Sequence, residues 1–223
     1  ATTEIYTLSL HDALPICVIV VIDVAKGVEA QTEKLVKVCR MRDTPIIVFI
    51  NKLDREGKDA FDLVDEVEQK LGLTLCPLSW PIGMGQRFQG VYSMWERNLN
   101  LYSADNKQKI SEGTSFEDIS NPELNAFVGD EAAEELRGDL ELLDAVYPKF
   151  DRDAYLKGEL CPVLFGSALN NFGVRELLDC FQDIAPEPQS KEADERLVLP
   201  QEDAFSGFVF KIHANIDPNH RNR

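Results

Sequence analysis

Residues 45–54 read PIIVFINKLD, an apolar run that ends in the polar segment NKLD. A continuous run of β-branched and aromatic residues is typical of a strand buried on both faces of a parallel sheet. Residues 17–23, CVIVVID, form a second such run, and apolar residues recur at helical spacing over 28–42 and 60–71. The order strand, helix, strand, helix predicts a right-handed α/β crossover fold.

The segment Asn51-Lys52-Leu53-Asp54 has the residue types of a guanine-binding loop. Ligands of α/β sheets bind beyond the carboxyl ends of the strands, which is where this segment falls. The Asp54 carboxylate can accept the N1–H and 2-amino hydrogens of guanine, whereas adenine lacks that donor pair and leaves the carboxylate unpaired. Asn51 is expected to shape the pocket, and Lys52 to lay its aliphatic stem along the purine face. The alternative is an ordinary polar loop with a solvated lysine.

A third strand is predicted at 162–165, and Gly166-Ser167-Ala168-Leu169 follows its carboxyl end. The Ala168 backbone N–H is expected to donate to guanine O6, and Ser167 to brace the loop through a hydrogen bond. The tripeptide Ser167-Ala168-Leu169 alone is a weak signal for a guanine site. Its position after a strand and after NKLD strengthens that signal. The candidate nucleotide-binding residues are therefore Asn51, Lys52, Asp54, Ser167, Ala168 and Leu169.

The helical and strand patterns also predict how the chain is divided. Residues 17–185 are expected to form the main domain, with a helix at 173–184 after the third strand. Proline and charged residues over 186–203 indicate a linker, and 204–223 are interpreted as the start of a β-barrel domain, with a strand at 205–213.

Residues 73–160 interrupt this pattern and are interpreted as an inserted α+β subdomain. An extended segment and a turn, WPIG, are expected near 75–83, and the turn either packs internally or binds a partner. Alternating residues predict short strands at 88–94 and 98–102. Residues 103–120 are expected to be loop, and apolar spacing predicts a helix at 131–146.

Residues 1–16, ATTEIYTLSLHDALPI, share no pattern with the rest of the chain. The string looks like the translation of a sequencing-adapter oligonucleotide, so we expect a non-native segment and exclude it from the fold. The alternative is a genuine amphipathic N-terminal segment.

Composition limits the class of protein. The 223 residues carry a formal net charge of −16, which disfavours non-specific binding to nucleic acid or anionic membranes. Five scattered cysteines without a CxxC pair predict reduced thiols and no zinc site. No apolar stretch approaches the length of a membrane-spanning helix, and a cytoplasmic protein is expected.

Two further features bear on catalysis. Asp23, at the end of the first strand, is more consistent with capping the following turn than with a catalytic role. No catalytic role is assigned to Lys26. The sequence contains no GxxxxGK[ST] phosphate loop and no DxxG before the first strand. Both elements hold phosphates and Mg²⁺ in phosphate-loop GTPases.

The chain resembles the translational GTPases of the elongation factor G group. The resemblance rests on IDVAKGVEAQT at 22–32, NKLDRE at 51–56, PIG and FQGV within 81–91, and GSALNNFGV at 166–174. Within that group, residues 41–56 and 205–223 are most similar to the peptide chain release factor 3 branch. The alternatives are another member, such as an elongation factor G-like or ribosome-protection GTPase, and a non-enzymatic interaction module.

The resemblance implies an α/β fold, namely a partial P-loop-type GTPase domain that keeps the last three strands of a doubly wound parallel sheet. It implies binding of GTP and GDP, with Mg²⁺ expected only for the full-length protein. It also implies GTP hydrolysis on the ribosome and, as partners, the ribosome and class I release factors. The phosphate loop and both switch regions would precede Cys17, so no catalytic residue is assigned in this chain. The strand at 17–23 is expected to pair with the phosphate-loop strand.

Overall fold

The computed structural model describes residues 16–101, 114–115, 119–188, 190–193 and 196–207. One compact unit spans Cys17–Ala185, and a second unit includes the described residues from Pro186 onward. Among the described residues, no helix is long and apolar enough to cross a membrane. The segment 1–15 and most of the predicted barrel strand lie outside the described residues.

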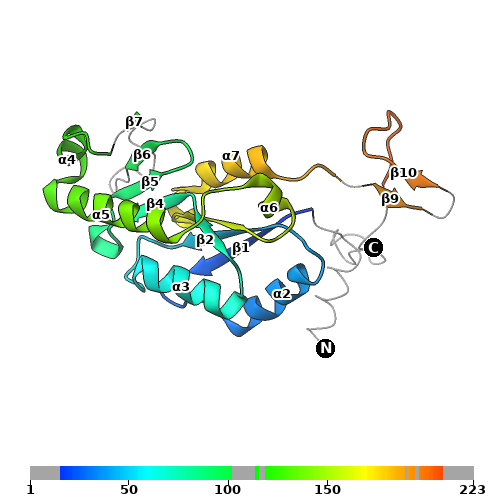
Figure 1. Ribbon diagram of the computed structural model, residues 1–223, viewed down its shortest axis with the longest axis horizontal. Coiled ribbons are helices and arrows are strands. Elements are labelled where there is room, and N and C mark those ends of the chain that lie inside the picture. Colours follow the sequence, from blue (N-terminus) through cyan, green and yellow to red (C-terminus); the bar gives the residue numbers. More distant parts are fainter. Residues whose placement is uncertain (1–15, 102–113, 116–118, 189, 194–195, 208–223) are drawn as a thin grey trace, which may run out of the picture. The chain divides into compact units, whose positions relative to one another are not determined.

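A four-stranded parallel sheet forms the centre of the compact unit (Figure 1). Its strands are β1 (Val18–Asp23), β2 (Ile46–Asn51), β8 (Cys161–Phe165) and β3 (Leu75–Pro77), in that order across the sheet. The predicted α/β class and its three main strands are confirmed. The expected number of strands is wrong, because β3, inside the range interpreted as an insertion, pairs with β8.

Helices cover both faces of this sheet (Figure 1). The predicted helices α2 (Ala30–Arg40) and α3 (Ala60–Leu71) lie on one side, and α6 (Arg152–Leu156) and α7 (Val174–Ile184) lie on the other. Alternate residues of β2 enter the two cores: Val48 and Ile50 one, Ile47 and Phe49 the other. Burial on both faces explains why the strand sequence is continuously apolar.

Local sequence defines both ends of α3, and its N-terminal cap also fixes the end of the loop that precedes it. The Asp59 side chain accepts the N–H groups of Phe61 and Asp62 and so caps the first turn. Gly72 ends the helix in a left-handed conformation, with φ of 62°. The segment between β2 and α3 is therefore held at its helical end.

The inserted subdomain has an antiparallel sheet of β4 (Ser79–Ile82), β5 (Gly90–Ser93), β6 (Asn98–Leu101) and β7 (Thr114–Ser115). A 3₁₀ turn, η1 (Gly85–Arg87), joins β4 to β5, and two helices follow, α4 (Glu123–Val128) and α5 (Asp130–Val146). The strands at 88–94 and 98–102 and the helix at 131–146 are confirmed. The loop prediction for 103–120 is wrong at β7 and lies otherwise largely outside the described residues.

Trp80, in strand β4, has a packing role. Trp80 is fully buried, its ring lies 4.6 Å from that of Phe61 and 5.2 Å from that of Phe165, and its Nε1–H donates to Asp139 Oδ2 at 2.8 Å. Of the two interpretations of the WPIG segment, internal packing is the one that the contacts support.

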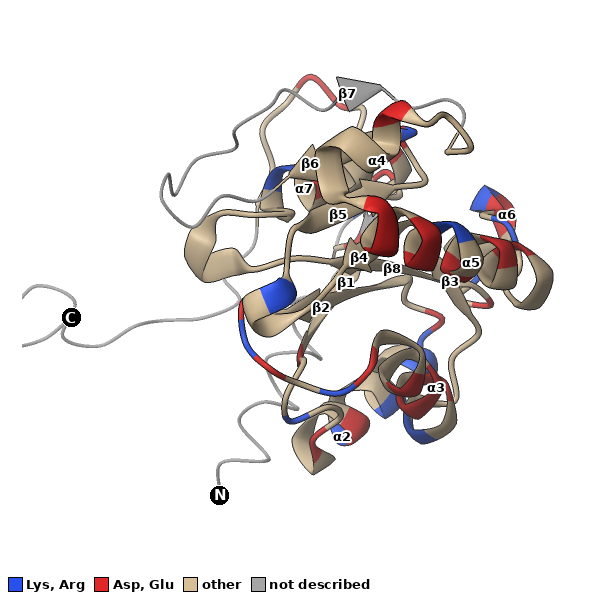
Figure 2. Cartoon of the chain, turned by 90° about the vertical axis from the view of Figure 1, so that its left-hand side faces the viewer, with Lys and Arg blue, Asp and Glu red and all other residues tan. Residues whose placement is uncertain are grey.

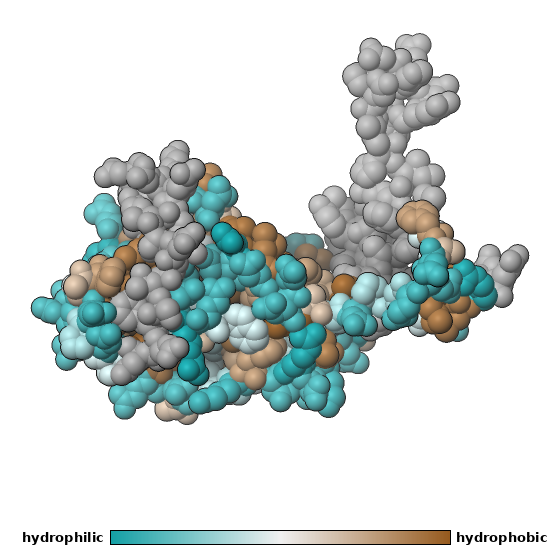
Figure 3. All heavy atoms as spheres, turned by 90° about the horizontal axis from the view of Figure 1, so that it is seen from above, coloured by the Kyte–Doolittle hydropathy of each residue, from teal (hydrophilic) through white to brown (hydrophobic). Residues whose placement is uncertain are grey.

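Charge and apolar surface are unevenly distributed. Acidic residues are concentrated along α5 and α3 (Figure 2), which accounts for much of the negative net charge. On the face that carries α7, apolar patches lie among polar side chains (Figure 3). Val21, Leu169 and Leu178 are large apolar residues that remain more than half exposed.

The second unit contains a short antiparallel hairpin, β9 (Lys191–Glu192) and β10 (Leu197–Val198). It lies within 186–203, for which the sequence predicted a linker. Residues 204–207, the described part of the expected barrel domain, contain no strand.

Candidate functional site

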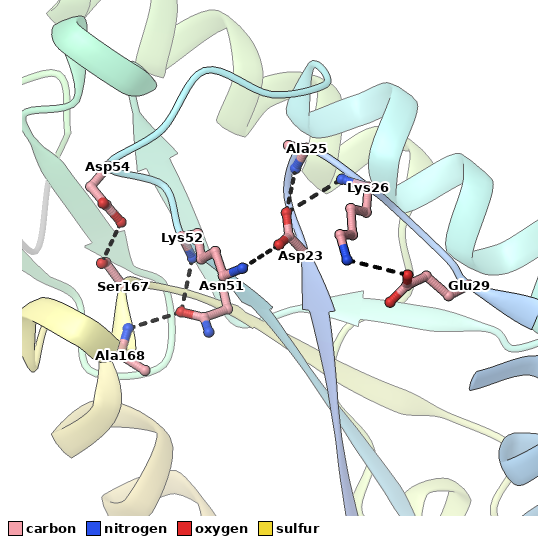
Figure 4. Close-up of polar contacts among 9 residues, drawn as sticks. All are labelled: Asp23, Ala25, Lys26, Glu29, Asn51, Lys52, Asp54, Ser167 and Ala168. Atoms are coloured by element: carbon pink, nitrogen blue, oxygen red, sulfur yellow. Dashed lines mark hydrogen bonds and ion pairs between the residues drawn. The ribbon is translucent and has the colours of Figure 1, made fainter. Parts of the chain in front are cut away.

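The candidate site lies where three parallel strands end, in the loops after β1, β2 and β8 (Figure 4). Asp23 and Asn51, the last residues of β1 and β2, are register partners. The loop after β8 is held to the loop after β2 by the main chain, because Leu53 N–H donates to the Gly166 carbonyl at 3.2 Å. Segments far apart in sequence therefore meet at one edge of the sheet.

Asn51 is the polar link between the two candidate loops. Its Oδ1 accepts the backbone N–H of Lys52 and that of Ala168, each at 2.8 Å (Figure 4). One side-chain oxygen thus fixes the NKLD loop and the start of the Ser-Ala-Leu turn together. In this structure the Ala168 N–H, expected to serve guanine O6, is engaged by Asn51.

Asp54 is oriented by Ser167. The Ser167 hydroxyl donates to Asp54 Oδ1 at 2.5 Å, and Ser167 is fully buried. Asn170 Nδ2 donates to the same Ser167 Oγ at 2.9 Å, which leaves the hydroxyl hydrogen directed to the carboxylate. The hydrogen bond expected of Ser167 is present, and its acceptor is the residue expected to contact the base.

The turn after β8 is tightly closed. Ser167 and Phe172 exchange both backbone hydrogen bonds, at 2.9 and 3.0 Å, around the 3₁₀ turn η2 (Ala168–Asn170). A Cβ on Gly166 would lie 2.5 Å from the Phe172 carbonyl oxygen and 2.6 Å from the Phe49 ring, so this position requires glycine. Ala168 is exposed at the tip, and Leu169 is 79% exposed.

Asp23 and Lys52 form an ion pair at the site. Lys52 Nζ lies 2.5 Å from Asp23 Oδ2, while Asp23 Oδ1 accepts Ala25 N–H at 2.9 Å and Lys26 N–H at 3.3 Å. The hydrogen bond from Lys52 is the main cause that lowers the pKa of Asp23. The predicted capping role of Asp23 is confirmed. Its pairing with Lys52 was not predicted, because the pair depends on the register between β1 and β2.

The structure thus brings together five of the six candidate residues and leaves Leu169 as an exposed neighbour. A cavity of about 680 Å³, lined by Trp95, Leu140, Tyr147 and Phe150 among others, contains none of the six. Within the described part of the chain, no group of three or more His, Cys, Asp or Glu residues could hold a metal ion. All five cysteines are free thiols.

Comparison with known proteins gives the family. Residues 11–187 match the model of the elongation factor Tu GTP binding domain. The chain belongs to this family. The elongation factor Tu GTP binding domain match begins at residue 11, inside the segment expected to be non-native, and ends two residues beyond the compact unit.

A solved structure shows the same fold. A crystal structure of a protein from Thermus thermophilus matches with a TM-score of 0.58 at 21% sequence identity, over 82% of this chain and 28% of that chain. The chain therefore spans just over a quarter of the length of that relative. The parallel sheet and the family together identify part of a P-loop-type GTPase fold from the GTP-binding domains of translational GTPases.

Proposed function

We propose that the edge formed by Asn51, Lys52, Asp54, Ser167 and Ala168 reads the base of GTP or GDP. The observation that carries the proposal is the Ser167–Asp54 hydrogen bond, because it aims a half-buried carboxylate from one loop with a fully buried side chain of another. The Asp54 carboxylate, held in this way, presents its two oxygens as hydrogen-bond acceptors in a fixed orientation to a planar base. Guanine supplies the matching pair of donors, whereas adenine does not.

The neighbouring contacts support a purine at this edge. Lys52 is partly exposed, and its ammonium is directed to Asp23, so the stem is the part of the side chain left to face a ring. Asn51 holds the Ala168 N–H close to the same edge. A guanine O6 that approached this N–H would share it with Asn51 Oδ1 or replace that oxygen as acceptor.

For the whole protein we propose a GTP-hydrolysing translation termination factor of the release factor 3 type, which acts on the ribosome in the cytoplasm and promotes dissociation of class I release factors. Family membership and the length of the similarity to this branch, above all residues 205–223, support the proposal. An elongation factor G-like or ribosome-protection GTPase accounts for the family match equally well. The genomic sequence around codons 17–223 and a peptide-release recycling assay of the encoded protein separate these possibilities.

The base-reading proposal is tested on the 223-residue chain by ligand-observed NMR titration with GDP, ADP and XDP. GDP is expected to bind better than ADP, with affinity far weaker than micromolar, because phosphate contacts dominate affinity in phosphate-loop proteins and this sequence has no GxxxxGK[ST]. Asp54→Asn should move the preference from GDP to XDP. Asp65→Asn, an exposed change on α3, is the control and should leave it unaltered. Equal binding of GDP and ADP by the unaltered chain would overturn the proposal.

A further inference from the structure

We propose that Asp23 is a positioning residue of the base-reading edge: through its ion pair it holds the stem of Lys52 where a purine ring would pack. This inference rests on the proposed function and adds to it a residue from a third loop, the one after β1. It also assigns the Lys52 ammonium to Asp23 rather than to a phosphate group.

Lys52 has a backbone conformation that needs support. Its φ is 73°, in the left-handed region that costs a residue with a Cβ on the order of 1 kcal/mol or more. Two contacts oppose this cost, the hydrogen bond from its own N–H to Asn51 Oδ1 and the ion pair from Nζ to Asp23. The main chain and the tip of the side chain are therefore both fixed, and the stem runs between two anchored points.

Asp23 is suited to be the fixed partner. Its Oδ1 is already held by the N–H groups of Ala25 and Lys26, so Oδ2 has a defined position before Lys52 contacts it. The Asp23 side chain is 17% exposed and that of Lys52 38%, so the pair is partly shielded from water. A charge-assisted hydrogen bond in such a place restrains a flexible side chain more firmly than a fully exposed pair does.

The geometry separates two contributions to binding. Asp54 would recognise the Watson–Crick edge of the base, whereas the Lys52 stem would pack on the ring face, which differs little between purines. Loss of Asp23 should therefore weaken GDP and IDP by the same factor and leave their ratio unchanged. IDP is the useful comparison because hypoxanthine keeps O6 and N1–H and lacks only the 2-amino group that Asp54 would accept.

The test measures GDP and IDP affinity of the 223-residue chain by ligand-observed NMR. Asp23→Asn keeps an acceptor for the turn, removes the charge, and is expected to weaken both ligands by about threefold to tenfold. Asp23→Ser, which can also cap the turn, should act alike. Lys52→Met keeps an apolar stem without an ammonium, and in that background Asp23→Asn should have no further effect.

Glu66→Gln is the matched control. Glu66 accepts Val28 N–H at 3.3 Å and pairs with Lys58 and Lys70, so it holds the far end of the same loop without contacting Lys52. It should destabilise the chain while leaving both affinities in place.

The outcomes distinguish this inference from the function on which it rests. Unchanged affinity in Asp23→Asn, or additive effects of Asp23→Asn and Lys52→Met, would overturn the positioning role and leave base reading intact. A changed GDP-to-IDP ratio in Asp23→Asn would show that Asp23 acts through Asp54 instead and would also overturn it. Absence of any GDP preference over ADP in the unaltered chain would overturn both the base-reading function and the positioning role of Asp23.

Discussion

Ser167 Oγ lies 2.5 Å from Asp54 Oδ1, and this one hydrogen bond joins loops whose residues are 113 positions apart in the sequence. Because Ser167 is fully buried, its hydroxyl has little freedom to find another acceptor. The orientation of the Asp54 carboxylate is therefore set by packing beneath it as well as by its own loop. Under the proposed function, Ser167 would thereby influence which base the site binds.

Ser167→Ala should reduce the preference for GDP over ADP by about tenfold, since one charge-assisted hydrogen bond of about 1.5–3 kcal/mol orients Asp54. NMR titration with both nucleotides measures the ratio. Ser79→Ala is the control, because the Ser79 hydroxyl is also buried and accepts Phe165 N–H at 3.0 Å, a contact to strand β8 and not to the loop that follows it. A retained GDP preference in Ser167→Ala would contradict the orienting role.

Asn51→Ala should loosen the contact between the two loops. The backbone N–H groups of Lys52 and Ala168 both lose their acceptor, at a cost of about 1–3 kcal/mol. Hydrogen–deuterium exchange at these two amides should accelerate, whereas exchange at Gly72 N–H, bonded to the Glu68 carbonyl at the end of α3, should not change. Unchanged protection of Ala168 would show that the main chain alone holds the turn.

Gly166→Ala should destabilise the compact unit by about 1–3 kcal/mol, because the added methyl meets the Phe172 carbonyl and the Phe49 ring and neither can move freely. Gly138→Ala, within α5 and with nothing within 4 Å of the new Cβ, should instead stabilise by about 0.5–1 kcal/mol. Urea denaturation followed by circular dichroism compares the two. Equal destabilisation by both substitutions would refute the steric argument.

Glu66 should make stability depend on acid pH. Hydrogen bonds from Lys58 and Lys70 lower the pKa of Glu66 from 4.5 to about 2. Its contribution is therefore present above pH 4.5 and lost as the pH falls toward 2.

Glu66→Gln should cost about 1–2 kcal/mol at neutral pH, less than the full shift implies, since water partly screens both lysines. The difference from the unaltered chain should shrink below pH 4.5, as followed by urea denaturation. A difference that is constant with pH would exclude this ion-pair network as its cause.

Val21→Lys should reduce self-association. Within the described parts of the chain, β1 has no strand on its outer edge, and Val21 on this strand is 56% exposed. An apolar edge of this kind pairs with other chains, and a lysine opposes such pairing. Analytical ultracentrifugation should show less oligomer for Val21→Lys than for the unaltered chain, while Lys37→Ala on α2 should not. A monomeric unaltered chain would contradict the expectation.

The sequence predicted those parts of the fold in which residue pattern and environment agree. Strands β1, β2 and β8 are apolar throughout because both faces of the sheet are covered, and α3 has an apolar face and a capping residue at Asp59. The extended segment expected near 75–83 includes β3, but its place in the parallel sheet was not predicted, because three residues ending in Pro77 show no periodicity and only pairing with β8 puts them in that sheet. The helices α4 and α6 were not predicted either, because helices this short show no clear residue periodicity.

The sequence predicted the candidate site as two motifs, NKLD and Ser-Ala-Leu. It did not predict which side chains of the site would pair with one another. Placement of NKLD and Ser-Ala-Leu at strand ends follows from the order of the elements, which the sequence contains. The Asp23–Lys52 pair depends instead on the register between β1 and β2, in which Asp23 lies opposite Asn51. Such a register is set by how whole strands align, and local residue patterns do not determine it.

Leu78 alone separates β3 of the parallel sheet from β4 of the antiparallel one. Its N–H donates to the Val163 carbonyl, and its own carbonyl accepts the N–H groups of Met94 and Trp95. A connection of one residue, bonded on both sides, cannot work as a hinge. A force applied to the inserted subdomain would therefore be transmitted as torque to the neighbouring sheet, and through the Gly85–Leu53 hydrogen bond it would reach the NKLD loop directly.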